Sequence, residues 1–363
     1  MERLWIITEF FYPDENPTSY ILGEMAKKLT EKYDVKVICS SSITHNSKES
    51  LNSQIEVIRV CGKLFDKNSI IGRILNFFLV SRRLLKVSKS KIRNGDKVLM
   101  VTNPAPLVLL MSKLKTEIGF QLYILVHDIF PENTKAAGFR FPGYSLLKKK
   151  FDCAYSHADS LFVLGRDMEC VMKEKIKNYS SECKIILLPN WADVSDVCPQ
   201  PFPQGKIILQ YAGNVGRVQG LSKVVETLPD FVDLHIYGSG AEDKRIKRIK
   251  RSNVFFHGPF PRFLQNEVLS ACHFAIVSLR DGMYGLGVPS KVYNILASGR
   301  PILFFGPKNS EVDLLIKEHN VGFYGWPTKW DKEEIAKMGR KARKLAIDKY
   351  SKDMILDEFL RMV

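Results

Sequence analysis

The chain has 363 residues, of which 45% are hydrophobic, 26% are charged and 11% are aromatic. These proportions exclude a disordered, collagen-like or repeat protein, and the length predicts two domains. The 54 lysine and arginine residues outnumber the 39 aspartate and glutamate residues, for a formal net charge of +15. We therefore expect an anionic partner: a phosphorylated metabolite, nucleic acid or an acidic membrane surface.

The first apolar run predicts a strand and not a signal peptide, because Glu9 interrupts it early. No run along the chain approaches the roughly 18 apolar residues of a membrane-spanning helix. The seven cysteines include no C-x-x-C pair, which predicts a reduced, cytosolic protein without a metal site. Any contact with a membrane is expected to be peripheral.

Short apolar runs alternate with helical patterns, which predicts βαβ units, parallel sheets and the α/β class. The first domain is predicted to hold strands at 4–8, 35–39, 57–60, 98–102, 122–126, 160–163 and 185–188. Prolines and acidic residues at 189–203 predict a linker. The second domain follows with strands at 207–211, 233–237, 254–257, 274–278 and 301–305. Ligands of such sheets bind beyond the carboxyl ends of the strands, so we expect the site in a cleft between the domains.

In the first domain, two segments are predicted to face this cleft. The loop after the first strand carries the polar residues Asn16, Thr18 and Ser19. His127, Asp128 and Glu132 follow strand 122–126, where acids, bases and hydroxyl-orienting groups are usually placed. The alternative is a hydrogen-bonded structural histidine followed by a helix cap.

Two basic stretches in the first domain suggest a membrane surface. Residues 70–93 combine apolar residues with seven lysine and arginine residues, a pattern typical of an interfacial helix. The alternative is a core helix with one solvated end. Three lysines at 148–150 extend the patch for anionic lipid. A third basic run at 244–251 predicts a solvated helix face, and since no nucleic-acid motif accompanies it, nucleic-acid binding is a minor alternative.

Two glycine turns in the second domain suggest phosphate binding. The first, YAGNVGRVQG at 211–220, follows a strand and lacks G-x-G-x-x-G spacing, which disfavours hydride transfer. Arg217 in this turn can clamp a phosphate, although a solvated surface arginine is the alternative. The second, GLGVPSK at 285–291, leads into a helix predicted to be capped by Ser290 and stopped by Gly299. Lys291 opposes the helix dipole unless an anion is present, which favours a diphosphate site over an ordinary capped helix.

Together these segments resemble glycosyltransferase family 4, which has the GT-B fold of two Rossmann-like domains, and most closely its bacterial fucosaminyltransferase-like branch. The matching segments are 11–19, HDIFPE at 127–132, PNWAD at 189–193, GNVGR at 213–217, YGSG at 237–240, PSK at 289–291 and GRP at 299–301. The resemblance implies an acceptor-binding domain over 1–190 and a donor-binding domain over 191–347. It also implies that a final helix, 348–363, packs back on the first domain.

The resemblance further implies the reaction and its partners. The protein would be a retaining glycosyltransferase that transfers a sugar from a nucleotide diphosphate donor, with UDP-N-acetylamino sugar as the expected one. The acceptor would be a polyprenyl-diphosphate-linked saccharide of O-antigen or capsule synthesis, used at the cytoplasmic face of a bacterial membrane. No cofactor is expected. The sequence lacks a D-x-D motif, and since fixed cations can neutralise the leaving diphosphate, no metal is expected either.

Site residues carried over by position divide into three groups. His127 and Asp128 would face the reacting sugar, and Glu132 would orient a hydroxyl or deprotonate the acceptor. The acceptor-side loop holds Asn16, Thr18 and Ser19. The donor site comprises Gly213, Asn214, Gly216, Arg217, Gly287, Ser290, Lys291 and Asn294, of which Arg217 and Lys291 would hold the diphosphate.

The sequence also departs from the family pattern at two pairs of positions. Paired glutamates of many members fall on Leu286 and Asn294, and a common Arg and Lys pair falls on Asn214 and Gln219. The missing glutamates leave open a non-catalytic membrane-associated paralogue. A second alternative, which shares the same architecture, is a GT-B nucleotide-sugar epimerase or hydrolase.

Overall fold

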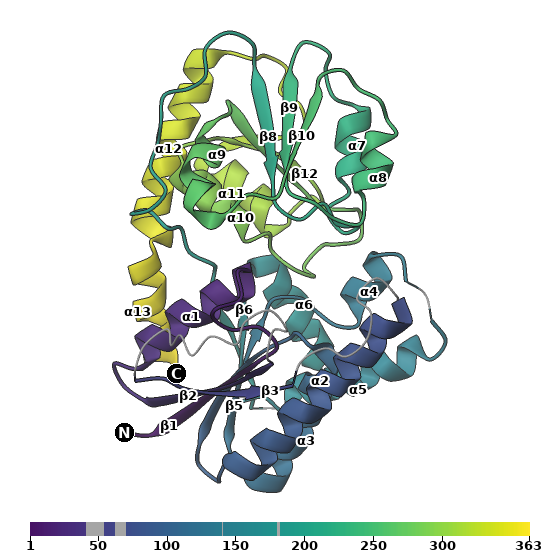
Figure 1. The fold of residues 1–363 in the computed structure, drawn as a ribbon, viewed down its shortest axis with the longest axis vertical. Coiled ribbons are helices and arrows are strands. Elements are labelled where there is room, and N and C mark those ends of the chain that lie inside the picture. The colour runs from purple at the N-terminus through teal and green to yellow at the C-terminus, as the bar shows by residue number, and fades with distance from the viewer. Residues whose placement is uncertain (41–53, 62–69, 140, 180–181) are drawn as a thin grey trace.

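The computed structural model describes residues 1–40, 54–61, 70–139, 141–179 and 182–363. In it the chain forms two α/β domains, each built on a parallel sheet, with the first domain below the second in Figure 1. The α/β class and the two-sheet architecture predicted from the alternating pattern are confirmed.

The N-terminal sheet consists of β1 (Arg3–Thr8), β2 (Asp34–Ser40), β3 (Glu56–Val60), β4 (Lys97–Val101), β5 (Gln121–Val126), β6 (Ser160–Val163) and β7 (Lys184–Leu187). Their order is β3-β2-β1-β4-β5-β6-β7. Central strands are continuous apolar runs because helices cover both faces of the sheet. The strand order reverses between β1 and β4, and such a switch point opens a crevice at the carboxyl ends of the strands.

The helices of this domain are α1 (Pro17–Leu29), α2 (Ile70–Lys91), α3 (Ala105–Ile118), α4 (Glu132–Ala136), α5 (Tyr144–Ser156) and α6 (Arg166–Ile176). Helix α2 packs on α3, α3 on α5, and α5 on α6. Right-handed crossovers place this layer on one face of the sheet and α1 on the other. Within the described residues, no helix is long and apolar enough to cross a membrane.

The C-terminal sheet consists of β8 (Ile208–Ala212), β9 (Asp233–Tyr237), β10 (Val254–Gly258), β11 (Phe274–Ser278), β12 (Ile302–Phe305) and β13 (Gly322–Tyr324), in the order β10-β9-β8-β11-β12-β13. Strand β13 was not predicted, since it has only three residues. Around the sheet lie α7 (Leu221–Glu226), α8 (Asp243–Lys247), η1 (Arg262–Leu264), α9 (Gln265–Ser270), α10 (Lys291–Ala297) and α11 (Glu311–His319). The switch point of this sheet lies between β8 and β11.

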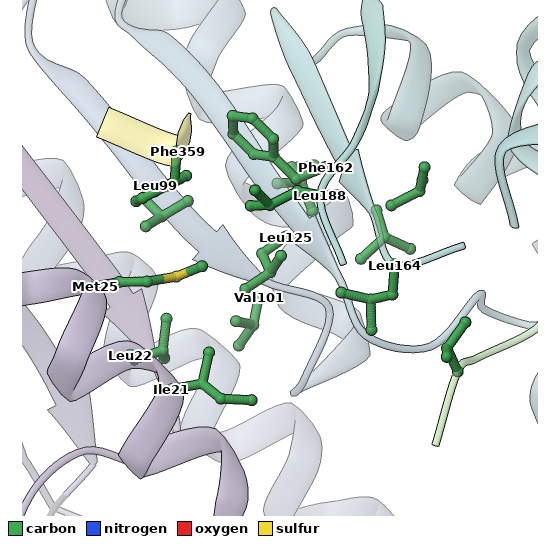
Figure 2. Packing of buried hydrophobic residues seen from close by; sticks show 14 of the residues in the cluster. Ile21, Leu22, Met25, Leu99, Val101, Leu125, Phe162, Leu164, Leu188 and Phe359 are labelled. Atoms are coloured by element: carbon green, nitrogen blue, oxygen red, sulfur yellow. The ribbon is translucent and has the colours of Figure 1, made fainter. Parts of the chain in front are cut away.

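The end of the chain returns from the second domain to the first, as the yellow helices in Figure 1 show. Two helices make this passage, α12 (Lys332–Tyr350) and α13 (Lys352–Met362), because Ser351 is extended, with φ −62° and ψ 143°. The prediction that the last helix begins at residue 348 is therefore wrong. Helix α13 packs on α1, and Figure 2 shows Phe359 among core residues of the N-terminal domain. Its ring lies 5.4 Å from that of Phe162 in an edge-on contact.

The two domains also contact each other directly through the glycine-rich turn that precedes α10. Ile129 donates its backbone N–H to Leu286 O at 3.1 Å. Gly285 N donates to the Asp167 carboxylate at 3.2 Å. Residues of both domains belong to one continuous buried cluster, so the turn that carries Gly287 is seated against the first domain.

Candidate active site

A cavity of about 210 Å³ lies between the domains, near the carboxyl end of β8. Helix α1 supplies the wall from the first domain, the linker supplies a second wall, and the starts of η1 and α10 supply the wall from the second domain. The lining residues are Pro17, Tyr20, Ile21, Asn190, Trp191, Asp193, Ala212, Gly213, Phe260, Arg262, Gln265, Leu269, Ser290, Lys291 and Asn294. Of the predicted donor-site residues, the cavity brings together Gly213, Ser290, Lys291 and Asn294.

Lys291, the first residue of α10, has a buried amine. Its Nζ finds no hydrogen-bond acceptor among the residues that the structure describes. The nitrogen lies 3.4 Å from the ring centroid of Tyr211. Burial lowers the pKa of Lys291 well below 10.5 because the charged form loses its water. An anion in the cavity would restore a partner to this amine and favour its protonated form.

The sequence predicts a residue for each end of α10, and the structure confirms one of the two. Ser290 precedes the helix with helical backbone angles and makes no side-chain cap hydrogen bond, so the predicted cap is wrong. Gly299 follows the helix with φ +65°, a conformation that favours glycine. The predicted stop at Gly299 is confirmed.

Asp193 of the linker connects the two domains at the wall of this cavity. Tyr20 of α1 donates its hydroxyl to Asp193 Oδ1, and Arg262 Nη2 donates to Oδ2 at 2.7 Å. The guanidinium of Arg262 also lies 3.4 Å from the Tyr20 ring centroid. Burial, with the adjacent Asp193 charge, raises the pKa of Tyr20 to about 12, so the hydroxyl remains a donor. With Asn294, these residues form what we call the Asp193 network.

Asn294 fits this network in a way that a glutamate could not. Its Oδ1 accepts from Asp193 N at 2.8 Å, and its Nδ2 donates to Asp193 Oδ2 at 3.0 Å. A glutamate has no donor when ionised, and it would place a second carboxylate beside a buried one. The departure from the glutamate pattern at position 294 thus has a physical reason in the linker carboxylate.

Close packing of two loops holds the turn after β8 in place. A Cβ on Gly238 would lie 1.9 Å from Gly213 O, and one on Gly240 would lie 2.3 Å from Val215 O. Val215 N donates to Ser239 O at 3.0 Å. The glycines of the YGSG segment are therefore required for the approach of the two loops, and through it they position Gly213 at the cavity.

The rest of the predicted phosphate loop lies outside the lining of this cavity. Asn214 is exposed and Gly216 is buried, and neither is a lining residue. Arg217 is exposed, and its guanidinium lies 5.3 Å from the ring centroid of Phe139 in the first domain. The structure thus separates Arg217 from the wall that carries Lys291.

His127 and Asp128 meet the second domain at Gly287. A Cβ on Gly287 would lie 3.2 Å both from Asp128 Oδ1 and from His127 O. Burial lowers the pKa of His127 to about 4 and raises the pKa of Asp128 to about 6. His127 Nε2 is buried and has no partner within the described ranges. At neutral pH the imidazole is therefore uncharged, and the carboxyl has a pKa suited to proton exchange.

Glu132 lies in a separate group of charges. Lys175 donates to its two carboxylate oxygens at 2.7 and 2.8 Å and also lies 2.6 Å from Asp152. Lys148 lies 2.6 Å from Asp152 and 3.5 Å from Glu132. These four residues line a second cavity of about 970 Å³, together with Tyr284 of the second domain. The contacts with Lys175 occupy both oxygens of Glu132.

The predicted acceptor-side loop borders a third cavity, of about 710 Å³. Asn16 caps α1, because its Oδ1 accepts from Ser19 N at 3.0 Å, and both residues line this cavity. Thr18 does not belong to its lining. Tyr20 and Arg262 line both this cavity and the 210 Å³ cavity, so their stacked pair separates the two spaces.

Sequence reasoning missed Tyr20, Arg262 and Gln265 as lining residues, and Asp193 was noticed only as part of a matching segment. No local pattern marks these residues, since they come from α1, η1, α9 and the linker. One available signal was that Arg262 follows a strand of the second domain, at the end that faces the cleft.

Two parallel α/β domains with a cation-lined cavity between them define the GT-B class, and comparisons with known proteins agree. An E. coli trehalose-6-phosphate structure bound with UDP-2-fluoro glucose is similar at TM-score 0.71 and 10% identity, over 99% of this chain and 98% of that one. WaaG, a glycosyltransferase involved in lipopolysaccharide biosynthesis, is similar at TM-score 0.66 and 13% identity, over 99% of both chains.

Sequence similarity shows the family. The chain is 31% identical over 350 residues to the probable glycosyltransferase WbjE of Pseudomonas aeruginosa, which covers 89% of this chain and 85% of WbjE. No model of a protein family matches the chain. On the strength of the WbjE match, the chain belongs to the glycosyltransferases with a GT-B fold.

Proposed function

We propose that this glycosyltransferase moves a sugar, with retention, from a UDP-N-acetylamino sugar to a polyprenyl-diphosphate-linked saccharide in bacterial surface polysaccharide synthesis. It would belong to the fucosaminyltransferase-like branch of glycosyltransferase family 4. The N-terminal domain, with α13, would bind the acceptor, and the C-terminal domain would bind the donor. The observation that carries the proposal is that the amine of Lys291, in the cavity between the domains, finds no hydrogen-bond partner among the described residues.

The donor class is supported by charge and by similarity. A buried amine without an acceptor is costly in the free protein and becomes favourable when an anion pairs with it. Gly213 and Ser290 line the same cavity, so backbone groups also lie near the proposed diphosphate. The E. coli structure with UDP-2-fluoro glucose has the same fold, and WaaG acts in lipopolysaccharide biosynthesis.

The reaction breaks the bond between the anomeric carbon and the β-phosphate oxygen, whose electron pair leaves with the diphosphate. The acceptor oxygen bonds to the same face of that carbon. Lys291 offsets one negative charge of the leaving diphosphate without a metal. His127 is neutral, and since its Nε2 has no hydrogen-bond partner within the described part of the chain, it can orient a sugar hydroxyl. Asp128 would take the acceptor proton, because Glu132 is already paired with Lys175.

One helix of the first domain supports contact with an anionic membrane. On α2 an exposed stripe begins with Leu75 and Phe78 and continues with Arg82 and Lys86, at spacings that place all four on one face. The Phe78 side chain is 53% exposed. The side chains of Ile70, Ile71 and Ile74, which belong to the predicted interfacial helix, lie outside the described part of the structure.

Helix α5 repeats this arrangement. Leu146, which is 61% exposed, precedes the exposed Lys149 and Lys150 on the outer face. Both α2 and α5 begin at the carboxyl side of the sheet, so their apolar ends lie toward the cleft and their basic residues lie one or two turns away. Apolar residues that enter a bilayer beside lysines that meet its headgroups suit an anionic surface.

The function is tested by thermal unfolding with UDP, GDP, ADP and CMP, without added metal. A ligand at about 100 times its dissociation constant adds roughly 2.7 kcal/mol of stability. We expect this rise with UDP and its loss in Lys291→Met. No rise with any nucleotide would contradict the proposal and favour the non-catalytic paralogue. Turnover of UDP-sugar without an acceptor, at the rate seen with one, would indicate the epimerase or hydrolase.

A further inference from the structure

The donor cavity needs a second positive group that the phosphate loop does not supply. A nucleoside diphosphate carries at least two negative charges at neutral pH, and Lys291 balances one. In the loop after β8, Asn214 and Gln219 are uncharged, and Arg217 lies outside the cavity lining, over the Phe139 ring. A donor site with one cation would leave at least one negative charge of the leaving group unbalanced.

Two cations stand among the described residues that line the 210 Å³ cavity, Lys291 and Arg262. They approach it from different elements, Lys291 from the start of α10 and Arg262 from η1. Because both side chains line the same cavity, a diphosphate bound there can contact both. We propose that Arg262 is the second phosphate-binding residue of the donor site, paired with Lys291. This assignment rests on the proposed function.

Arg262 has hydrogen-bonding capacity to spare. A guanidinium carries five N–H donors in a planar fork, and the structure gives Arg262 one hydrogen bond to a described residue, from Nη2 to Asp193 Oδ2. The remaining donors are available to phosphate oxygens, which the fork can bind in pairs. The side chain is 47% exposed, so a ligand can reach it without displacing the core.

The Asp193 network also holds this fork in advance of binding. The Tyr20 ring supports the face of the guanidinium at 3.4 Å, and Asp193 fixes one edge. A side chain that is already positioned loses less conformational entropy when a ligand binds. If Arg262 shifts toward the ligand, Asp193 keeps its hydrogen bonds from Tyr20 and Asn294. The network therefore presents Arg262 to the cavity and tolerates its movement.

Calorimetric titration with uridine, UMP and UDP tests the assignment. For Arg262→Gln we expect the UDP affinity to fall about 10- to 150-fold, the value of a charge-assisted hydrogen bond, while the uridine affinity changes less than about twofold. Arg262→Lys should recover part of the loss for UDP. Arg340→Gln, which removes an exposed arginine on α12, is the matched control and should bind all three ligands like the unmodified protein.

Three results would overturn the assignment. If Arg262→Gln weakens uridine, UMP and UDP by one common factor, the residue supports the network and does not bind phosphate. If Arg217→Gln selectively weakens UDP and Arg262→Gln does not, Arg217 is the second cation. If the unmodified protein binds none of the three ligands, the proposed donor class is refuted, and the role of Arg262 with it.

Discussion

Replacing Lys291 with methionine should stabilise the free protein and weaken its binding to nucleotide. The methionine side chain has nearly the same length and keeps the contact with the Tyr211 ring. It removes a buried amine that finds no acceptor within the described residues. A buried polar group left without a partner costs about 1 to 3 kcal/mol, so the free energy of unfolding of Lys291→Met should rise by about this amount.

The pH dependence of this gain follows from the sign of the pKa shift. Burial lowers the pKa of Lys291, so between the folded value and about 10.5 the unfolded chain binds more protons. The stability of the unmodified protein should therefore rise with pH across that window. The Lys291→Met variant lacks this slope, and its advantage should shrink as the solution becomes alkaline.

Binding should respond in the opposite direction. Loss of one charge-assisted hydrogen bond is worth roughly 1.5 to 3 kcal/mol, which corresponds to a roughly 10- to 150-fold weaker UDP affinity. Because the amine gains a partner when UDP binds, UDP should also drive proton uptake in the unmodified protein, which is visible as a dependence of the calorimetric enthalpy on the buffer.

The assay combines denaturant unfolding of both proteins from pH 7 to pH 10 with calorimetric titration of UDP. Lys344→Met, which removes an exposed lysine on α12, is the control for the loss of one charge. A variant that is less stable than the unmodified protein at pH 7, with unchanged UDP affinity, would refute the reasoning. Lys291 would then be a structural residue.

Three further predictions concern other parts of the molecule. The pKa of Asp128 is raised to about 6, so folding favours the protonated carboxyl, and the stability that this provides at low pH is lost as the pH rises through 6. Between pH 4 and pH 7, the free energy of unfolding of Asp128→Asn should therefore gain roughly 1 to 3 kcal/mol over that of the unmodified protein. Equal pH profiles of the two proteins in urea unfolding would contradict this. Asn294→Asp places a carboxylate where Asn294 Nδ2 donates to Asp193 at 3.0 Å. The free energy of unfolding should fall by about 1 to 3 kcal/mol at pH 7 and partly recover at pH 4. A loss that does not depend on pH would exclude charge repulsion as its cause. In cosedimentation, the protein should bind phosphatidylglycerol vesicles and not phosphatidylcholine vesicles, and the double variant with Arg82→Gln and Lys86→Gln should lose about 2 kcal/mol of binding. If the double variant binds like the unmodified protein, and both lipids are bound equally, α2 does not contact the membrane.

The periodicity of the sequence determined the class of fold and the places of most strands. Buried strands of parallel sheets are short apolar runs, and a run such as Phe274–Ser278 can be read without knowledge of its neighbours. The misses occurred where local signal is weak. Strand β13 has three residues, and the break between α12 and α13 depends on one extended serine.

The same distinction holds within the candidate site. Lys291 was predicted because its conflict with the helix dipole is a local property of the sequence around it. The cavity around its amine, the Asp193 network and the place of Arg262 depend on side chains from α1, the linker, η1 and α10. Hydrogen bonds such as those from Tyr20 and Arg262 to Asp193 join residues 173 and 69 positions apart. Only the packing of the two domains decides such contacts, because no spacing along the chain encodes which loops meet across a cleft.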